Sequence, residues 1–164
     1  MSTEYIILVL VWIISIGLLL YVVPKGKRRE AQISFLFMQT LAWFFGVIVV
    51  ELELIVYPVR FFAYTLKNSF TFEFLAFPTI SVLFNIFFPK RKPLNKRLLY
   101  ISTFPTVLIM IEVLLEKYTD NIEYLNWNWF YSWSSMLAAL LVSYAYFNWF
   151  FKNHPRHTHE IGTV

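Results

Sequence analysis

The sequence predicts an all-α polytopic membrane protein with five transmembrane helices and an interfacial or re-entrant segment after the second helix. Of its 164 residues 59% are hydrophobic and 21% aromatic, whereas soluble domains are about 45–50% apolar. Only 15% are charged, which is too few to cover the surface of a soluble globule. Five runs of mostly apolar residues are long enough to cross about 30 Å of hydrocarbon.

The first apolar run covers residues 5–23 and contains no charged residue. Basic residues follow it instead of preceding it, which is the opposite of a cleavable signal peptide, so we expect a retained helix. The other expected spans are 31–50, 70–88, 98–115 and 129–151. Together they predict one transmembrane bundle over residues 1–151, followed by a basic cytoplasmic tail at 152–164.

Lysine and arginine are unequally divided between the two sides of the predicted bundle. Eleven of the 14 lie in residues 25–29, in residues 90–97 and in the tail, and the other three are Arg60, Lys67 and Lys117. Basic residues of short loops stay on the cytoplasmic side. We therefore expect a cell membrane location with the amino terminus outside and the carboxyl terminus cytoplasmic. The excess of basic over acidic residues is therefore explained by orientation in the lipid bilayer. No nucleic acid partner is expected.

The segment ELELIVYPVRFFAYTLKNS, residues 51–69, is too apolar for an ordinary loop and too charged for a span. Its aromatic residues suit headgroup depth, which predicts a segment along the outer interface or a re-entrant piece. The alternative is a sixth span, which would move the carboxyl terminus to the outside.

Acidic residues gather at the predicted outer ends of the spans. Glu112 and Glu116 share one helix face, Glu73 lies near the start of the third run, and Glu51 ends the second. Ionisable residues in a span usually face the bundle interior or a water-filled cavity. This pattern predicts a site for a cation, a proton or a polyhydroxyl ligand, with Arg60 as a possible partner. The alternative is a set of carboxylates, some paired with Arg60, that only hold helices together.

Three further features of the predicted spans can be interpreted from residue type and position. In EYLNWNWFYSWSS, residues 123–135, Asn128 and two serines share a helix face within an aromatic belt, which suits helix packing or an aromatic-lined pocket. Pro78 and Pro105 predict kinks or a broken helix at a binding site. Asn85 is expected to hydrogen-bond between helices.

Several kinds of chemistry are missing from the sequence. There is no cysteine, and the three histidines lie in the terminal tail, so we expect no metal site and no cofactor. No nucleotide-binding, metalloprotease or serine-hydrolase motif is present. Most membrane enzymes are therefore disfavoured, and an intramembrane carboxylate enzyme acting on lipid or cell-wall precursors is the remaining enzymatic alternative.

Three stretches carry a resemblance: VELELIVYPVR, SFTFEFLAFPTISVLFNIFFP and IEVLLEKYTDNIEYLNWNWFYSW. Over about residues 40–150 the chain resembles an uncharacterised family of small multi-span membrane proteins of spore-forming bacilli and clostridia. The resemblance implies a Gram-positive cytoplasmic membrane and implies no particular activity.

The leading functional prediction is a non-enzymatic protein with an outer-leaflet polar cavity built from Glu73, Glu112 and Arg60. The cavity would bind a small ligand or cation in a transport, sensing or accessory role. The alternative is a structural subunit that partners a second copy of itself or another membrane protein.

Overall fold

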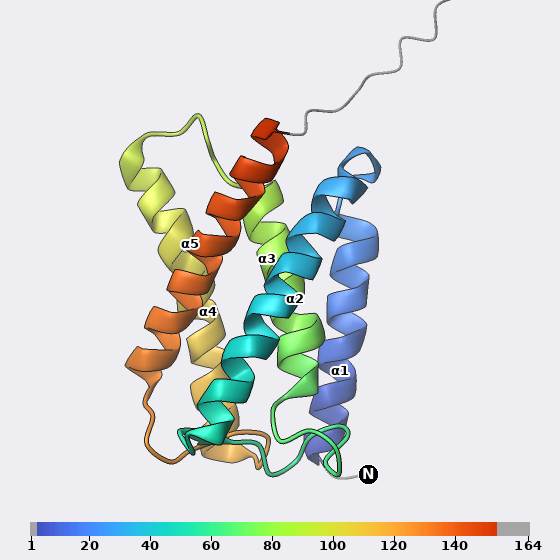
Figure 1. Ribbon diagram of the computed structural model, residues 1–164, viewed down its shortest axis with the longest axis vertical. Helices are drawn as coiled ribbons and strands as arrows, with labels where there is room; N and C mark the ends of the chain where they lie inside the picture. Colours follow the sequence, from blue (N-terminus) through green and yellow to red (C-terminus); the bar gives the residue numbers. More distant parts are fainter. Residues whose placement is uncertain (1–2, 154–164) are drawn as a thin grey trace, which may run out of the picture.

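The computed structural model describes residues 3–153, which form a helical bundle with very little sheet (Figure 1). The predicted tail, with His154, His157 and His159, lies outside the described residues from position 154 on. The helical elements are α1 (Thr3–Gly17), the π-helical turn η1 (Leu18–Val22), the 3₁₀ turn η2 (Lys25–Lys27), α2 (Arg28–Glu51), the π-helical turn η3 (Phe72–Ala76), α3 (Phe77–Ile86), α4 (Leu94–Tyr118) and α5 (Trp129–Asn153). An all-α architecture is confirmed.

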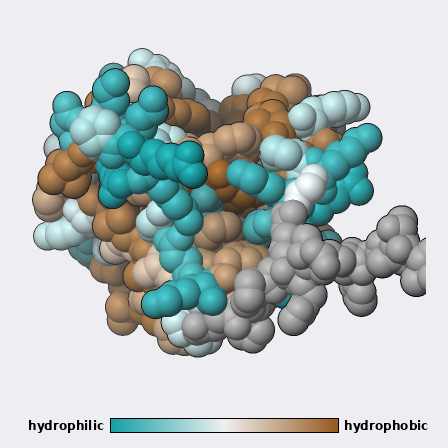
Figure 2. Space-filling model, turned by 90° about the horizontal axis from the view of Figure 1, so that it is seen from above, coloured by the Kyte–Doolittle hydropathy of each residue, from teal (hydrophilic) through white to brown (hydrophobic). Residues whose placement is uncertain are grey.

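Four helical segments are long and apolar enough to cross a membrane: Thr3–Val22, Lys25–Glu51, Leu94–Tyr118 and Trp129–Lys152. Most of their residues are not buried inside the bundle, and many large apolar side chains are exposed. Soluble monomers rarely expose so much contiguous apolar surface, so these helices indicate membrane insertion. At the end of the bundle that carries the α1–α2 and α3–α4 loops, hydrophilic residues form groups with hydrophobic residues between them (Figure 2).

The third predicted run forms a shorter helix than expected. The five residues of η3 and the ten of α3 span about 22 Å at the usual helical rise. Pro78 lies next to the π turn, where the Phe77 amide donates to the Phe72 carbonyl. Proline has no N–H and disturbs the preceding turn. The wider π turn accommodates Pro78 without ending the helix. Unlike the other helices, α3 is buried along most of its length.

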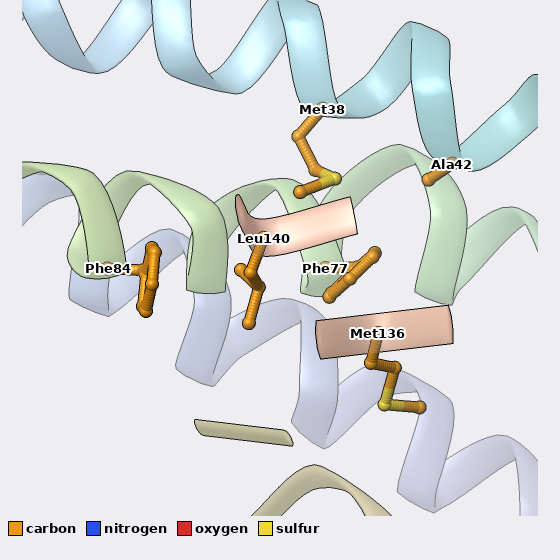
Figure 3. Packing of buried hydrophobic residues seen from close by; sticks show 6 residues of the cluster. All are labelled: Met38, Ala42, Phe77, Phe84, Met136 and Leu140. Atoms are coloured by element: carbon orange, nitrogen blue, oxygen red, sulfur yellow. The ribbon is translucent and has the colours of Figure 1, made fainter. Parts of the chain in front are cut away.

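The core forms where α3 packs against α2 and α5. Its six buried members are Met38, Ala42, Phe77, Phe84, Met136 and Leu140, which come in pairs from α2, α3 and α5 (Figure 3). The faces of α2, α3 and α5 that contact one another therefore carry apolar residues. Their burial makes α3 the central element, which explains how it can be shorter than its neighbours.

A buried polar cluster joins the same three helices. The Asn85 side-chain amide donates to Ser34 Oγ at 2.7 Å and to Ser143 Oγ at 2.9 Å. The Ser81 and Ser143 hydroxyls lie 2.8 Å apart. Small serines allow close approach of helices inside a membrane while their hydroxyls remain bonded. The prediction that Asn85 bonds between helices is confirmed.

Residues 52–69 contain no helix, so the structure offers no sixth spanning helix there. The segment forms turns and the strand β1 (Ile55–Val56), which pairs antiparallel with β2 (Glu123–Tyr124). Further bonds run from the Leu125 amide to the Leu54 carbonyl at 3.0 Å and from the Val59 amide to the Asp120 carbonyl at 2.9 Å. The α2–η3 and α4–α5 connections are thereby joined at one end of the bundle. No pattern in the sequence predicts this pairing.

Candidate functional site

A cavity of about 430 Å³ lies between α2, the η3–α3 helix and α5, near the end that carries β1 and β2. Apolar side chains form most of its wall, including Ala42, Phe77 and Met136 from the core. Its polar lining residues are Tyr57, Glu73, Glu112, Trp127, Ser132 and Ser135. The two acids predicted to share a site, Glu73 and Glu112, therefore line the same cavity.

Glu73 lies on the π turn and is only 2% exposed. Its Oε2 accepts a hydrogen bond from the Asn68 side-chain amide, whereas its Oε1 is buried and accepts no hydrogen bond from any residue that the structure describes. On the facing helix α2 stands Gly46, where an added Cβ would overlap this carboxyl group. The glycine therefore provides the space that the Glu73 side chain occupies.

Glu112 is held by hydroxyl groups from two other segments. Tyr124 Oη, carried by β2, donates to Glu112 Oε1 at 2.5 Å, and Ser132 Oγ of α5 donates to the same oxygen at 2.6 Å. Trp127 Nε1 donates to Ser132 Oγ at 2.8 Å. A chain of hydrogen bonds thus orients the Glu112 carboxyl group, and both hydroxyl donors use a single one of its oxygens.

Two tyrosines lie beside these acids: Tyr57 lines the cavity, and Tyr124 donates to Glu112 from β2. Burial, followed by the nearby carboxyl groups of Glu112 and Glu73, raises the pKa of Tyr57 well above its ordinary value. Burial is also the largest cause that raises the pKa of Tyr124, and Glu112 adds to it. Both phenols therefore keep their hydroxyl proton near pH 7, and Tyr124 donates its own to Glu112.

The two cavity acids have no basic partner among the described residues. Within residues 3–153 the one ion pair joins Lys67 to Glu51 at 3.5 Å, and both of its side chains are mostly exposed. The same residues contain no group of three or more His, Cys, Asp or Glu side chains arranged to hold a metal ion. Glu73 and Glu112 thus place two acidic groups in a largely apolar cavity without a compensating cation from the described part of the chain.

Arg60 does not take the position that the sequence suggested. Its guanidinium donates to the backbone carbonyls of Leu66 at 2.6 Å, Tyr57 at 2.6 Å and Ala63 at 3.2 Å. The prediction that Arg60 helps to build the cavity or pairs with its acids is wrong. The turns of residues 57–66 direct three carbonyls at the guanidinium, so Arg60 stabilises the loop to which it belongs.

The other predicted site residues also lie away from the cavity. Glu51 and Arg60 line a separate cavity of about 280 Å³, and Glu116 is half-buried one turn beyond Glu112. Asn128 begins α5: its Oδ1 accepts from the amides of Phe130 at 3.0 Å and Tyr131 at 3.1 Å. This is the N-cap role for which asparagine is well suited. Of the three residues predicted on this face, only Ser132 and Ser135 line the cavity.

The sequence did not identify Gly46, Asn68 and Tyr124 as part of the site. Of these three, Gly46 is the one that the sequence could have indicated, because a glycine within an apolar helix often marks close approach of another group. Asn68 and Tyr124 lie in connecting segments, where the sequence shows no periodic pattern that would place them.

No protein-family model matches this chain, and no curated protein and no solved structure matches it either. The geometry of the site is therefore the basis for the functional argument.

Proposed function

We propose that this chain is a five-span membrane protein whose outer-leaflet cavity binds a small organic cation with an apolar body. The observation that carries the proposal is the pair Glu73 and Glu112, which line one mostly apolar cavity without a basic partner in the described residues. Transport, sensing and an accessory role are all compatible with such binding.

In this proposal the sheet end of the bundle faces the outside of the cell. The α1–α2 and α3–α4 loops at the other end, together with the first turns of α2 and α4, carry nine lysines and arginines, which favours the cytoplasmic side. The buried η3–α3 helix is the fifth span, and residues 52–69 cover the outer end at the interface. A carboxyl-terminal reporter that is active outside the cell would contradict this orientation.

The cavity suits a ligand that combines one positive charge with apolar surface. Its volume of about 430 Å³ lies in the usual range for small-molecule sites, which are mostly apolar with a few polar groups that fix orientation. An ionised carboxylate away from water is costly unless it is paired. The ammonium group of a ligand would provide that pair, and the apolar wall would bind the rest of the molecule.

The location of Glu73 supports a binding role. Single π turns inside α-helices occur frequently at functional sites, and Glu73 lies on such a turn. One of its two oxygens is buried without a hydrogen bond from residues 3–153. The positive charge of a ligand beside this oxygen would compensate a buried acceptor that is otherwise unsatisfied, which costs free energy.

One observation favours the structural alternative. The Glu112–Ser132 hydrogen bond joins α4 to α5, so Glu112 also contributes to holding these helices together. In the structural alternative, the two acids stabilise the bundle and bind no ligand.

Thermal unfolding of the purified protein with benzyltrimethylammonium tests the proposal. Its neutral isostere neopentylbenzene has the same shape and provides the charge control. We expect the cation to raise the Tm of the wild type, and Glu73→Gln and Glu112→Gln to reduce that increase. Glu116→Gln, which changes an acid outside the cavity, is the matched variant and should respond like the wild type. Equal responses of all four proteins would contradict the proposal and favour the structural role.

A further inference from the structure

A second and larger cavity, of about 660 Å³, lies at the opposite end of the bundle. It is bordered by the α1–α2 loop, the α3–α4 loop and the carboxyl-terminal end of α5 (Figure 1). Its polar and charged lining residues are Lys27, Glu30, Asn85, Lys90, Arg91 and Lys92. None of these residues belongs to the outer cavity, so the two sites are separate.

Basic residues dominate the rim of this second cavity. Four lysines and arginines line it together with one carboxylate, that of Glu30. Two of the lysines are positioned by the chain: Lys90 Nζ donates to Asn148 Oδ1 at 2.7 Å, and Lys27 Nζ donates to the Ile86 carbonyl at 3.4 Å. The rim therefore offers a net positive charge to an anionic group.

The inner wall of the second cavity presents a hydrogen-bond acceptor. Asn85 is 2% exposed, and its side-chain amide nitrogen is used by the serine cluster described above. Its Oδ1 is buried and accepts no hydrogen bond from the described residues 3–153. An unsatisfied buried acceptor is unfavourable, so a donor group of an occupant would be stabilised at this position.

The remaining wall is apolar and aromatic, and includes Phe88, Phe147 and Phe151. Hydrophobic residues also lie between the hydrophilic groups at this end of the molecule (Figure 2). A free phosphate would use only the basic rim, whereas a lipid would also cover the apolar wall with its glycerol backbone and acyl chains. The composition of the wall therefore favours a lipid over a soluble anion.

We propose that this cavity binds an anionic phospholipid whose headgroup carries a hydroxyl group, as in phosphatidylglycerol. The lipid phosphate contacts Lys27, Lys90, Arg91 and Lys92, and the headgroup hydroxyl donates to Asn85 Oδ1. Basic pockets between helices on the cytoplasmic side are suited to anionic headgroups. This site is independent of the organic cation proposed for the outer cavity.

Native mass spectrometry of the full chain in a neutral detergent tests the lipid and its chemistry. Four probes are compared: phosphatidylglycerol, phosphatidylcholine, phosphatidylpropanol and soluble glycerol 3-phosphate. We expect phosphatidylglycerol to bind at least about tenfold more tightly than zwitterionic phosphatidylcholine. It should also bind more tightly than phosphatidylpropanol, which has the same charge and no headgroup hydroxyl. Glycerol 3-phosphate should not displace it at equal concentration.

Two double variants locate the binding within the cavity. Arg91→Gln/Lys92→Gln removes two charges from the lining, and we expect the affinity for phosphatidylglycerol to fall by about thirtyfold. Lys25→Gln/Arg28→Gln removes two charges at the same end of the bundle from residues that do not line the cavity. This control should bind phosphatidylglycerol like the wild type.

Four results would overturn the proposal. Equal retention of phosphatidylcholine and phosphatidylglycerol would exclude an anionic lipid site, and an equal loss in both double variants would indicate general charge attraction. Displacement by glycerol 3-phosphate would identify a soluble phosphate ligand. Equal binding of phosphatidylpropanol would show that no headgroup hydroxyl serves Asn85. The lipid is varied because Asn85 variants would also disrupt the serine cluster and with it the fold.

Discussion

Gly46 of α2 lies directly against the carboxyl group of Glu73, so that any Cβ at position 46 would overlap it. This contact joins the carboxyl-terminal part of the second apolar run to the π turn of the third. It also shows why a residue with no side chain belongs to the candidate site.

Gly46→Ala should destabilise the protein. In a helix interior this exchange normally stabilises by up to about 1 kcal/mol, whereas forcing extra volume into a packed position costs about 1–3 kcal/mol. We expect the second effect to dominate and the Tm in detergent to fall. Gly17→Ala is the control, because a Cβ there has nothing within 4 Å. The Gly46→Ala/Glu73→Ala double variant should regain stability relative to Gly46→Ala. A Gly46→Ala protein as stable as the wild type would contradict the contact.

Tyr124→Phe should weaken the orientation of Glu112. The variant removes the hydroxyl that donates to Glu112 Oε1, and the loss of such a hydrogen bond costs about 1 kcal/mol, or more when the partner is charged. Thermal unfolding measures this loss of stability, and cation binding to the outer cavity should also weaken. Tyr118→Phe is the matched control, because Tyr118 is 70% exposed. Equal behaviour of the two variants would indicate that the Tyr124 hydroxyl does not orient Glu112.

Asn128→Ala should lower stability without changing ligand affinity. Losing an N-cap typically costs about 1 kcal/mol, and Asn128 caps α5 outside the cavity. Asn128→Asp keeps an acceptor oxygen and should remain close to the wild type. Unfolding and binding measured on the same preparations separate the two roles. A selective loss of binding in Asn128→Ala would instead support a direct contact with the ligand.

Alkaline titration should reveal the environment of the two loop tyrosines. The pKa of Tyr57 and of Tyr124 is raised in the folded protein, so both phenols stay neutral above about pH 10, where unfolded tyrosine ionises. Their contribution to stability is complete below that pH and is lost as the pH rises toward the folded pKa.

Ultraviolet absorbance of tyrosinate follows this titration. The Tyr57→Phe/Tyr124→Phe variant should lose signal only in the late part of the curve, and its stability should fall less steeply with pH. Exposed tyrosines ionise near pH 10. If the tyrosinate absorbance of the double variant were lower than that of the wild type already at this pH, the buried environment of Tyr57 and Tyr124 would be contradicted.

Some features of this protein follow from local sequence alone. A helix occupies each of the five predicted apolar runs, because a long apolar segment satisfies its backbone groups within a helix. The clustering of basic residues between those runs is likewise a property of the sequence. Asn85 was correctly expected to bond between helices, because a buried amide in an apolar run needs partners.

The partners of the polar residues were decided by the tertiary structure. Arg60 was expected near the acids, yet nearby carbonyls of its own loop hold it. Glu112 instead bonds to Tyr124, which the β1–β2 pairing brings to it. Backbone pairing between two irregular segments leaves no periodic signal in the sequence, so neither outcome was predictable.

Local sequence is sufficient to predict apolar helices with basic connections at one end and acidic groups toward the other. The tertiary structure is needed to show that Glu73 and Glu112 line one cavity, that Gly46 leaves space for Glu73, and that α3 is the buried central helix. The two kinds of feature differ in how far along the chain the interactions behind them reach. Helix formation and hydrophobicity act between near neighbours in the chain, whereas a cavity depends on how helices distant in sequence pack together.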